Sequence, residues 1–354
     1  MYPRNNFLYL SLLFSFAMMF SCANTSDYKS DVILGETNNT IKFCEHVNSA
    51  SITILNDDSS CIIGQIKKVE ETADSYFAMN QQKTAIVKFD KKGNFVDKLH
   101  KVGRAKDEYV TINDFSVDEK SQQLALLCNY TKIIICDLSF NIKEIFDWGM
   151  PMERICLHNS YLYGLNQIEN KIVFLSGKKP QVIIHGIRPD SWVFTQTSVF
   201  FKTGNKLLAT LECDNNVYVI DSCNVYKYLS FTYEGYKEVI NQYRKKNNDQ
   251  TESTNQIPLA RIWNINESND TLNLFYSKDW VIRYASIDMN NKTIIFDGIF
   301  IGSPSPKWNG LKHELIAESF SSGSGFPIDT SYIKKIDSQF DPSMIGSVIV
   351  KYKY

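Results

Sequence analysis

A β-propeller is the fold that the sequence predicts, because a unit of four strands recurs five times. Within each unit, short runs of alternating apolar and polar residues are separated by turns rich in Gly, Asn, Asp or Ser, which is typical of antiparallel strands. The third strand of the unit ends at Asp90, Asp137, Asp221 and Asp288 in four cases and at Ser176 in the other. A four-strand repeat with a period of roughly 40 to 50 residues is typical of propeller blades.

The five units follow one another along the chain, with a longer step before the fifth. They span residues 65–99, 112–148, 152–186, 198–231 and 260–298. The turn that begins at Asp90 shows the expected chemistry. An Asp at the first position of a type I turn accepts backbone N–H bonds, and Gly93 or Asn94 can take the left-handed conformation that closes the hairpin. A single blade cannot cover both of its faces, so the blades must stack into a closed ring.

Closure of the ring asks for a sixth blade, which the two ends of the chain can supply. SITILND at 51–57 and GSVIVKYKY at 346–354 are strand-like segments outside the five units, and pairing them would remove exposed sheet edges. Residues 234–260 interrupt the period and are interpreted as an insertion. We therefore expect a six-bladed β-propeller of four-stranded antiparallel blades over residues 41–354, closed by pairing the N- and C-terminal strands.

Composition supports a large folded domain and argues against one class of partner. The chain of 354 residues is 44% hydrophobic and 13% aromatic, with a formal net charge of −1. Such a chain buries a substantial core. Without a basic stripe or a net positive charge, nucleic acid is not an expected partner.

The N-terminus reads as a secretory signal. An uncharged apolar run follows Arg4 and stops at Cys22, and it is too short for a comfortable membrane span. The Ser-Cys pair at its end resembles the lipobox of bacterial lipoproteins, in which the cysteine is acylated and becomes the mature N-terminus. We expect a signal peptide over 1–21, lipidation at Cys22, and a polar tether over 22–40. An ordinary cleaved signal with an incidental cysteine is the alternative.

An ordered set of short motifs carries a family resemblance. KFDKKGNFVDKL, then VGRAKDEY, then INDFSVDEKSQQLALLC resembles six-bladed β-propeller lipoproteins of Bacteroidetes, which are related in shape to NHL-repeat propellers. In that family a segment like Gly-x-Gly-Pro-Gly-Glu-Tyr leads into an Asp-Phe strand. The matching residues here are Gly103, Glu108, Tyr109, Asp114 and Phe115, whereas Ala105, Lys106 and Asp107 replace the glycine and proline stretch.

The resemblance implies a fold and a cellular location, and it supplies no catalytic residues. It implies an outer-membrane lipoprotein that faces the periplasm or the cell surface. It also makes the stretch from Asp90 to Tyr109 the outer hairpin of one blade and the crossing to the next, with Glu108 and Tyr109 holding that connection.

Few residues are candidates for a site. His158 ends the inner strand of the third unit and is the histidine expected near the central channel, as a ligand or base, although a lone histidine is more often structural. Trp192 and Trp308 lie in turn-rich segments and could present rings on which sugars stack. No nucleophile elbow, zincin motif or phosphate-binding loop occurs. Most of the cysteines other than Cys22 are expected as buried thiols, with one disulfide left open.

These observations favour a non-catalytic binding or interaction platform, without a cofactor, for a glycan, a peptide or an envelope protein. The alternative is a metal-dependent NHL-like or lactonase-like hydrolase or lyase whose site lies at the central channel. That enzyme would need Ca²⁺ or Zn²⁺ held by three or more converging ligands. A structural subunit of a larger envelope complex is a third interpretation.

Overall fold

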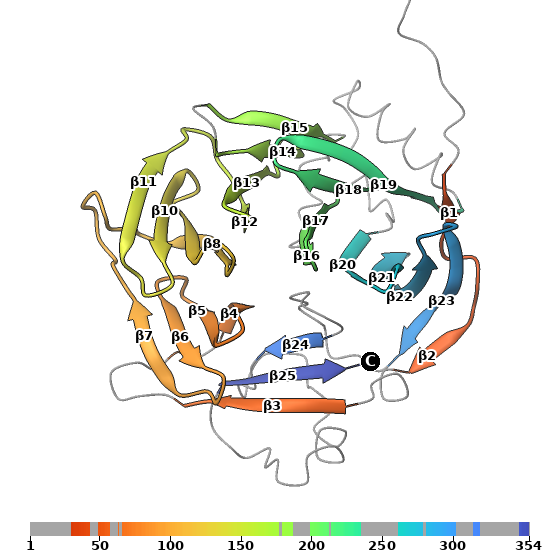
Figure 1. Ribbon diagram of the computed structural model, residues 1–354, viewed down its shortest axis with the longest axis horizontal. Helices are drawn as coiled ribbons and strands as arrows, with labels where there is room; N and C mark the ends of the chain where they lie inside the picture. Colours follow the sequence, from red (N-terminus) through yellow and green to blue (C-terminus); the bar gives the residue numbers. More distant parts are fainter. Residues whose placement is uncertain are drawn as a thin grey trace, which may run out of the picture.

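Six β-sheets stand around a central axis in the computed structural model (Figure 1). The structure describes residues 30–42, 49–56, 63, 66–176, 179–186, 199–211, 214–234, 261–278, 281–301, 314–318 and 347–353. The predicted insertion, apart from Glu234, lies outside these residues, as does the predicted signal peptide. None of the described residues form a helix with the length and hydropathy that a membrane span requires.

Blades one to three are four-stranded antiparallel sheets, as predicted. Blade one contains β4 (Ile66–Glu71), β5 (Ser75–Asn80), β6 (Ile86–Asp90) and β7 (Phe95–Leu99). Blade two contains β8 (Ile112–Asp118), β9 (Gln123–Cys128), β10 (Lys132–Asp137) and β11 (Ile142–Asp147). Blade three contains β12 (Arg154–His158), β13 (Tyr161–Asn166), β14 (Lys171–Phe174) and β15 (Gln181–His185).

Blades four and five have the same four antiparallel strands and one additional strand each. Blade four contains β16 (Phe200–Thr203), β17 (Lys206–Ala209), β18 (Asn216–Asp221) and β19 (Asn224–Thr232). Blade five contains β20 (Arg261–Ser268), β21 (Thr271–Lys278), β22 (Val281–Asp288) and β23 (Thr293–Ile301). The additional strands are β1 (Val32–Ile33) on β19 and β2 (Thr40–Lys42) on β23, and both pairings are parallel.

The sixth sheet closes the ring by joining the two ends of the chain, which confirms the prediction. Its described strands are β24 (Glu314–Glu318), β25 (Ser347–Lys353) and β3 (Ser49–Leu55). The C-terminal β25 pairs antiparallel with the N-terminal β3, from Ser347 opposite Leu55 to Lys353 opposite Ser49. Leu55 and Ile349 are fully buried together with residues of blade one, so the closing blade also packs on the first.

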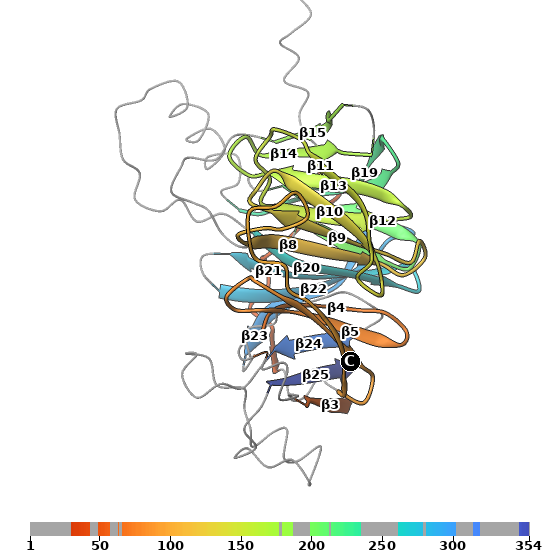
Figure 2. The ribbon, with the colours of Figure 1, turned by 90° about the vertical axis from the view of Figure 1, so that its left-hand side faces the viewer.

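In blades one to five the first of the four antiparallel strands lies nearest the axis and the fourth lies toward the outside, with β1 and β2 beyond β19 and β23 (Figure 1). In the sixth sheet β24 is the inner strand and β3 the outer one, and Figure 2 shows the same ring from its side. Each blade is covered on both faces, which explains why its middle strands are almost entirely apolar. In β9, Leu124 and Leu126 pack in the core shared with blade one, and Ala125 and Leu127 pack in the core shared with blade three. Burial on both faces therefore replaces the apolar–polar alternation of a one-sided sheet.

The turn chemistry matches the expectation. The Asp90 carboxylate accepts bonds from the backbone N–H groups of Lys92 and Asn94, each at 2.8 Å. Gly93 has a φ of +85°, and a Cβ there would lie 1.9 Å from the Ile54 carbonyl oxygen of β3. Only glycine therefore fits, both for the left-handed backbone and for this approach to the closing blade.

The crossing from blade one to blade two is held as predicted. Tyr109 is fully buried, and its hydroxyl donates to the Thr84 carbonyl at 3.1 Å. The Glu108 carboxylate accepts the Ala105 N–H at 2.8 Å and occupies the space that a side chain at Gly103 would need. The stretch raised by the family resemblance is thus a structural connection.

An N-terminal strap, residues 30–42, runs along the outer edges of blades four and five before β3 enters the sixth blade (Figure 1). Val32 and Leu34 of the strap are buried in the core between blades four and five. Most of the strap falls within the segment expected to be a tether. The folded domain therefore starts no later than Asp31, about ten residues before residue 41, where the sequence predicted its start.

Candidate functional site

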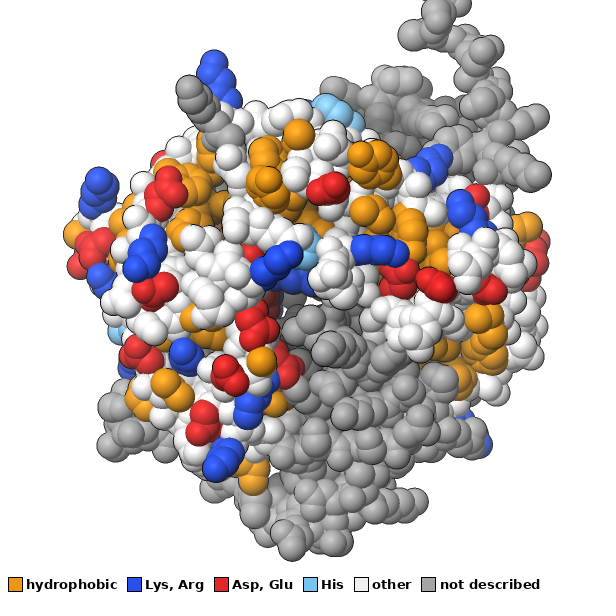
Figure 3. Space-filling view, in the orientation of Figure 1, with side chains coloured by type: hydrophobic (Ala, Val, Ile, Leu, Met, Phe, Trp, Pro, Cys, Tyr) orange, Lys and Arg blue, Asp and Glu red, His pale blue; other side chains and the backbone are white. Residues whose placement is uncertain are grey.

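Charged side chains from three blades meet at the central axis. The inner strands of a propeller have an open edge toward the axis, and their backbone N–H groups need partners there. Figure 3 shows acidic and basic side chains around the hollow at the centre of one face. We define the channel network as the following residues and their contacts: Lys68 and Glu70 of β4, Asp114 and Ser116 of β8, and Lys202 of β16.

The acceptors of the channel network bind the inner strand of the next blade. The Glu70 carboxylate accepts the Val117 N–H of blade two at 2.7 Å. Asp114 accepts the Ile155 N–H of blade three at 2.9 Å, and the Ser116 hydroxyl accepts the Leu157 N–H at 3.0 Å. These bonds connect three successive blades at the axis.

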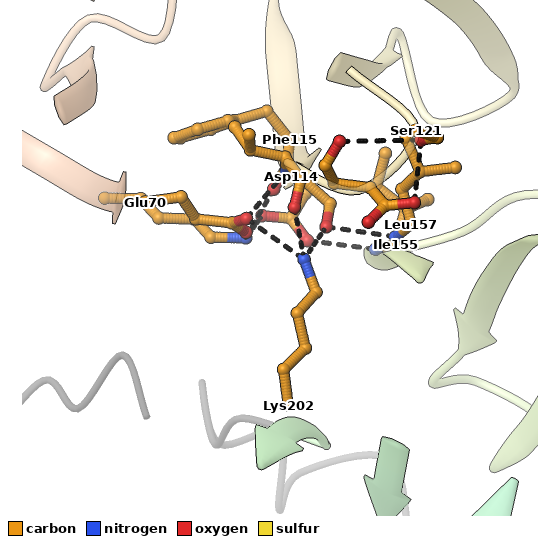
Figure 4. A network of polar contacts seen from close by, with 11 residues as sticks. Glu70, Asp114, Phe115, Ser121, Ile155, Leu157 and Lys202 are labelled. Carbon is orange, nitrogen blue, oxygen red and sulfur yellow. Dashed lines mark hydrogen bonds and ion pairs between the residues drawn. The ribbon is translucent and has the colours of Figure 1, made fainter. Parts of the chain in front are cut away.

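The two lysines balance the two carboxylates. Lys68 Nζ lies 2.8 Å from Asp114 Oδ1 and 3.0 Å from Glu70 Oε1. Lys202 extends from blade four toward blades one and two (Figure 4), where Nζ lies 3.3 Å from Glu70 Oε2 and 2.9 Å from Ser116 Oγ. Lys202 also donates to the Val117 carbonyl at 2.6 Å. It therefore connects blade four with blades one and two across the axis.

Ion pairing outweighs burial in setting the charges of the network. Burial alone raises the pKa of Glu70, but Lys202, Lys68 and the Val117 N–H hold it below its usual range. Burial lowers the pKa of Lys68, whereas Asp114 and Glu70 raise it further above its ordinary value. Glu70 and Lys68 are therefore charged at neutral pH and paired with each other.

Acid is expected to weaken the fold through three of its carboxylates. The pKa of Glu70 is lowered as described, and bonds from Asn94 and Asn141 lower the pKa values of Asp90 and Asp137. A lowered folded-state pKa contributes stability above the unfolded value of about 4, and this stability is lost as the pH falls through the folded-state pKa. The contribution of these three carboxylates to the free energy of unfolding should be constant from about pH 7 to 5 and fall below about pH 4.

Urea unfolding at pH 7, 5 and 3.5 measures this dependence. A Glu70→Gln variant keeps an acceptor for the Val117 N–H, and it should lose less stability on acidification than the parent protein. An acid dependence that is identical in the two proteins would contradict the role given to Glu70.

His158, the predicted channel residue, lies at the end of β12 and is largely buried. Its Nε2 atom lies 3.3 Å from the Asn205 carbonyl oxygen and 3.0 Å from Asn159 Nδ2. Burial and the charge of Lys202 lower its pKa. A role for His158 in ligand binding stays a prediction, and Trp192, Trp308 and Cys22 lie outside the described residues.

The described residues bear on two further expectations, one about metal ligands and one about the cysteines. In the part of the chain that the structure describes, no three His, Cys, Asp or Glu side chains are grouped so that they could hold a metal ion. Cys128, Cys136 and Cys156 are buried free thiols, as expected, and Cys223 is an exposed one. Burial raises the pKa of Cys156 to about 11, so this thiol is protonated and unreactive.

Sequence reasoning missed the channel network, although a signal for it was present. Glu70 and Glu71 are adjacent on β4 and therefore point to opposite faces of the sheet, and Glu71 pairs with Lys91 instead. The signal was the polar residue at every second position of the inner strands, at Lys68 and Glu70 in one blade and at Asp114 in the next. Such residues have only the axis and the next blade to face.

Comparison with solved structures places the fold in context. One similar structure is the crystal structure of a protein from Bacteroides fragilis NCTC 9343, whose name proposes that it is exported. It shares 13% identity with this chain at a TM-score of 0.63, over 90% of this chain and 99% of that one. Another is BamB from Moraxella catarrhalis, with 10% identity and a TM-score of 0.47 over 75% of this chain and 72% of that one.

No curated protein matches the chain. A family described as "6-bladed beta-propeller" matches residues 21–296. This match covers the first four predicted units, β3 of the closing blade, and the fifth unit as far as residue 296 within β23, and it ends before β24 and β25. The chain therefore belongs to the 6-bladed beta-propeller family.

Proposed function

We propose that this protein is a non-catalytic interaction platform of the cell envelope, which presents the surface of a rigid ring to a glycan, peptide or protein partner. One observation supports the proposal above all. The charged side chains of the channel network, which lie at the axis where a propeller enzyme would hold its catalytic groups, are paired with one another and with backbone N–H groups of the next blade. Charges that hold the blades together are not available as acid, base or metal ligand.

Partner capture tests this proposal. The purified protein is immobilised and exposed to a glycan array and to a solubilised envelope extract. We expect it to retain a saturable partner, and loss of that partner in a His158→Ala variant would assign His158 to the binding surface. Turnover of a retained glycan would instead favour the metal-dependent hydrolase or lyase at the channel.

The same proposal includes a lipid anchor at Cys22 and an outer-membrane location, facing either the periplasm or the cell surface. The apolar run that ends in Ser-Cys supports it, and the kinship with Bacteroidetes lipoproteins and NHL-type propellers belongs to the same proposal. Metabolic labelling with a fatty-acid analogue should depend on Cys22. Undiminished labelling of a Cys22→Ala variant would contradict the anchor.

A further inference from the structure

Three blades carry an aromatic residue at the same place on the outer strand. The Asp that ends the third strand serves as the reference point in each of these blades. The residue five positions before it pairs with a residue of the outer strand, and these pairs are Lys132 with Asp147 in blade two, Asn216 with Ser230 in blade four and Arg283 with Ile299 in blade five. The next residue along each outer edge is Trp148, Phe231 or Phe300. The corresponding residues of blades one and three are Lys101 and Gly186.

The strap covers this position in blades four and five. Val32 of β1 lies opposite Phe231, and Ile41 of β2 lies opposite Phe300, in both cases with the added strand parallel to the outer strand. The backbone of the strap bonds to the blade on both sides of Phe231, since Asp31 N–H donates to the Ser230 carbonyl at 2.9 Å and Leu34 N–H donates to the Thr232 carbonyl at 2.7 Å. Outer edges of this propeller therefore accept a parallel strand beside an aromatic residue.

Blade two has the same apolar row without such a cover among the described residues. In blade four the row is Leu229, Phe231 and Tyr233, which are 0%, 2% and 5% exposed. The equivalent row in blade two is Phe146, Trp148 and Met150, and each of these side chains is only partly buried. β19 extends to Thr232 beneath the added strand, whereas β11 ends at Asp147 and Gly149 has a φ of +64°, so the extended edge of blade two ends next to Trp148.

The Trp148 side chain has a second distinguishing property. Its indole Nε1 is buried and has no hydrogen-bond partner among the described residues. Buried indole N–H groups normally have an acceptor, because an unpaired buried donor is costly. Because protein atoms already cover this N–H, a strand added beside Trp148 supplies its acceptor only if the indole turns outward.

We infer that the rim groove, formed by Phe146, Trp148 and Met150 of blade two with Val182 of blade three, binds an extended segment of a partner polypeptide that adds as a parallel strand to β11. This inference rests on the proposed interaction function and gives it a surface and a class of partner. The binding mode is strand addition, in which backbone bonds supply affinity and alternate side chains supply specificity.

The strap defines the sequence that the rim groove selects. Val32 and Leu34 are buried, whereas Ile33 between them is 45% exposed, so the partner needs apolar residues at two alternate positions. Asp31 precedes them and binds Ser230 of blade four. In blade two the place of Ser230 is taken by Asp147, with exposed Glu144 nearby on the same strand. Lys132 lies opposite Asp147 on β10 and offsets part of this negative charge, and the remaining charge favours a lysine or arginine over a carboxylate in the partner.

The partner segment is therefore expected to contain, in order, a basic residue, an apolar residue, a residue of any type and a second apolar residue. The probe is a fluorescently labelled peptide of residues 30–38 in which Asp31 is replaced by lysine, Ser-Lys-Val-Ile-Leu-Gly-Glu-Thr-Asn. Its affinity for the purified full chain, whose own strap occupies blade four, is measured by fluorescence anisotropy. We expect saturable binding at one site.

Two control peptides test the selected sequence. The unaltered sequence with Asp31 should bind about three- to tenfold more weakly than the lysine peptide. A lysine peptide that also carries Leu34→Ser should bind at least about tenfold more weakly. Equal affinity of all three peptides would overturn the proposed groove.

Three protein variants locate the binding. Trp148→Ala should abolish binding, and thermal unfolding verifies that this variant is folded. Asp147→Asn retains an acceptor for the Gly149 N–H, which Asp147 now caps at 2.7 Å, and should narrow the difference between the lysine and aspartate peptides. Ile33→Ser, on the exposed side of the strap, should leave binding unchanged.

The outcomes separate this inference from the proposed function. Failure of the lysine peptide to bind, or binding that Asp147→Asn and Trp148→Ala both leave unchanged, overturns the rim groove. If a partner from the array or the envelope extract is still retained under those conditions, the interaction function stands and its surface lies elsewhere.

Discussion

Replacing Asp297 with alanine is expected to lower the free energy of unfolding by about 3 to 5 kcal/mol, because it breaks a buried ion pair and detaches the strap. Asp297 is 3% exposed, and its carboxylate accepts the Gly35 N–H of the strap at 2.6 Å and the Tyr276 hydroxyl at 2.5 Å. The variant leaves the guanidinium of Arg283 buried without its anion. Denaturant unfolding measures the loss.

The strap itself gives a second readout. Hydrogen exchange at the Leu34 amide, which bonds to the Thr232 carbonyl at 2.7 Å, should become faster in Asp297→Ala. The combined variant Arg283→Met with Asp297→Leu removes both charges and should be less destabilised than the sum of its single changes. Additive losses, or unchanged exchange at Leu34, would contradict the idea that this pair fastens the strap.

Replacing Glu70 with alanine is expected to cost about 3 kcal/mol, near the lower end of the range for buried pairs because the side chain is 16% exposed. The change leaves the Val117 N–H without its acceptor and removes the carboxylate that both Lys68 and Lys202 contact. The loss is measured by urea unfolding at pH 7.

A neutral partner pair provides the control for this result. Glu70→Gln keeps the bond to Val117 and should cost less than Glu70→Ala. Adding Lys202→Met to Glu70→Gln should recover part of that cost, because the double variant no longer contains the Lys202 ammonium group that lost its carboxylate partner. An alanine variant as stable as the parent protein would mean that the channel network does not hold the blades together.

The repeat was predictable because local chemistry specifies it. The strand from Gln123 to Cys128 is apolar throughout, and turns such as the one from Asp90 to Asn94 carry their own hydrogen-bonding code. Closure by β3 and β25 was also predictable, since two leftover strands at the chain ends have one place to pair.

The strap was not predictable in the same way. Val32, Ile33 and Leu34 lie in a segment that is mostly polar, and three consecutive apolar residues give no period that predicts which of them are buried. Their burial depends on a groove made by two blades that lie about 200 residues further along the chain. The channel network escaped prediction for a related reason. The distance between Glu70 and Lys202 is set by ring closure, and no local pattern encodes it.

The most direct test of the proposal that the axis holds blades together and performs no chemistry is metal analysis of the protein, purified without chelator, combined with thermal unfolding in EDTA, Ca²⁺ and Zn²⁺. We expect no stoichiometric divalent ion and an unchanged melting temperature in all three conditions. A stoichiometric ion whose removal lowers the melting temperature would contradict that proposal and favour the metal-dependent enzyme.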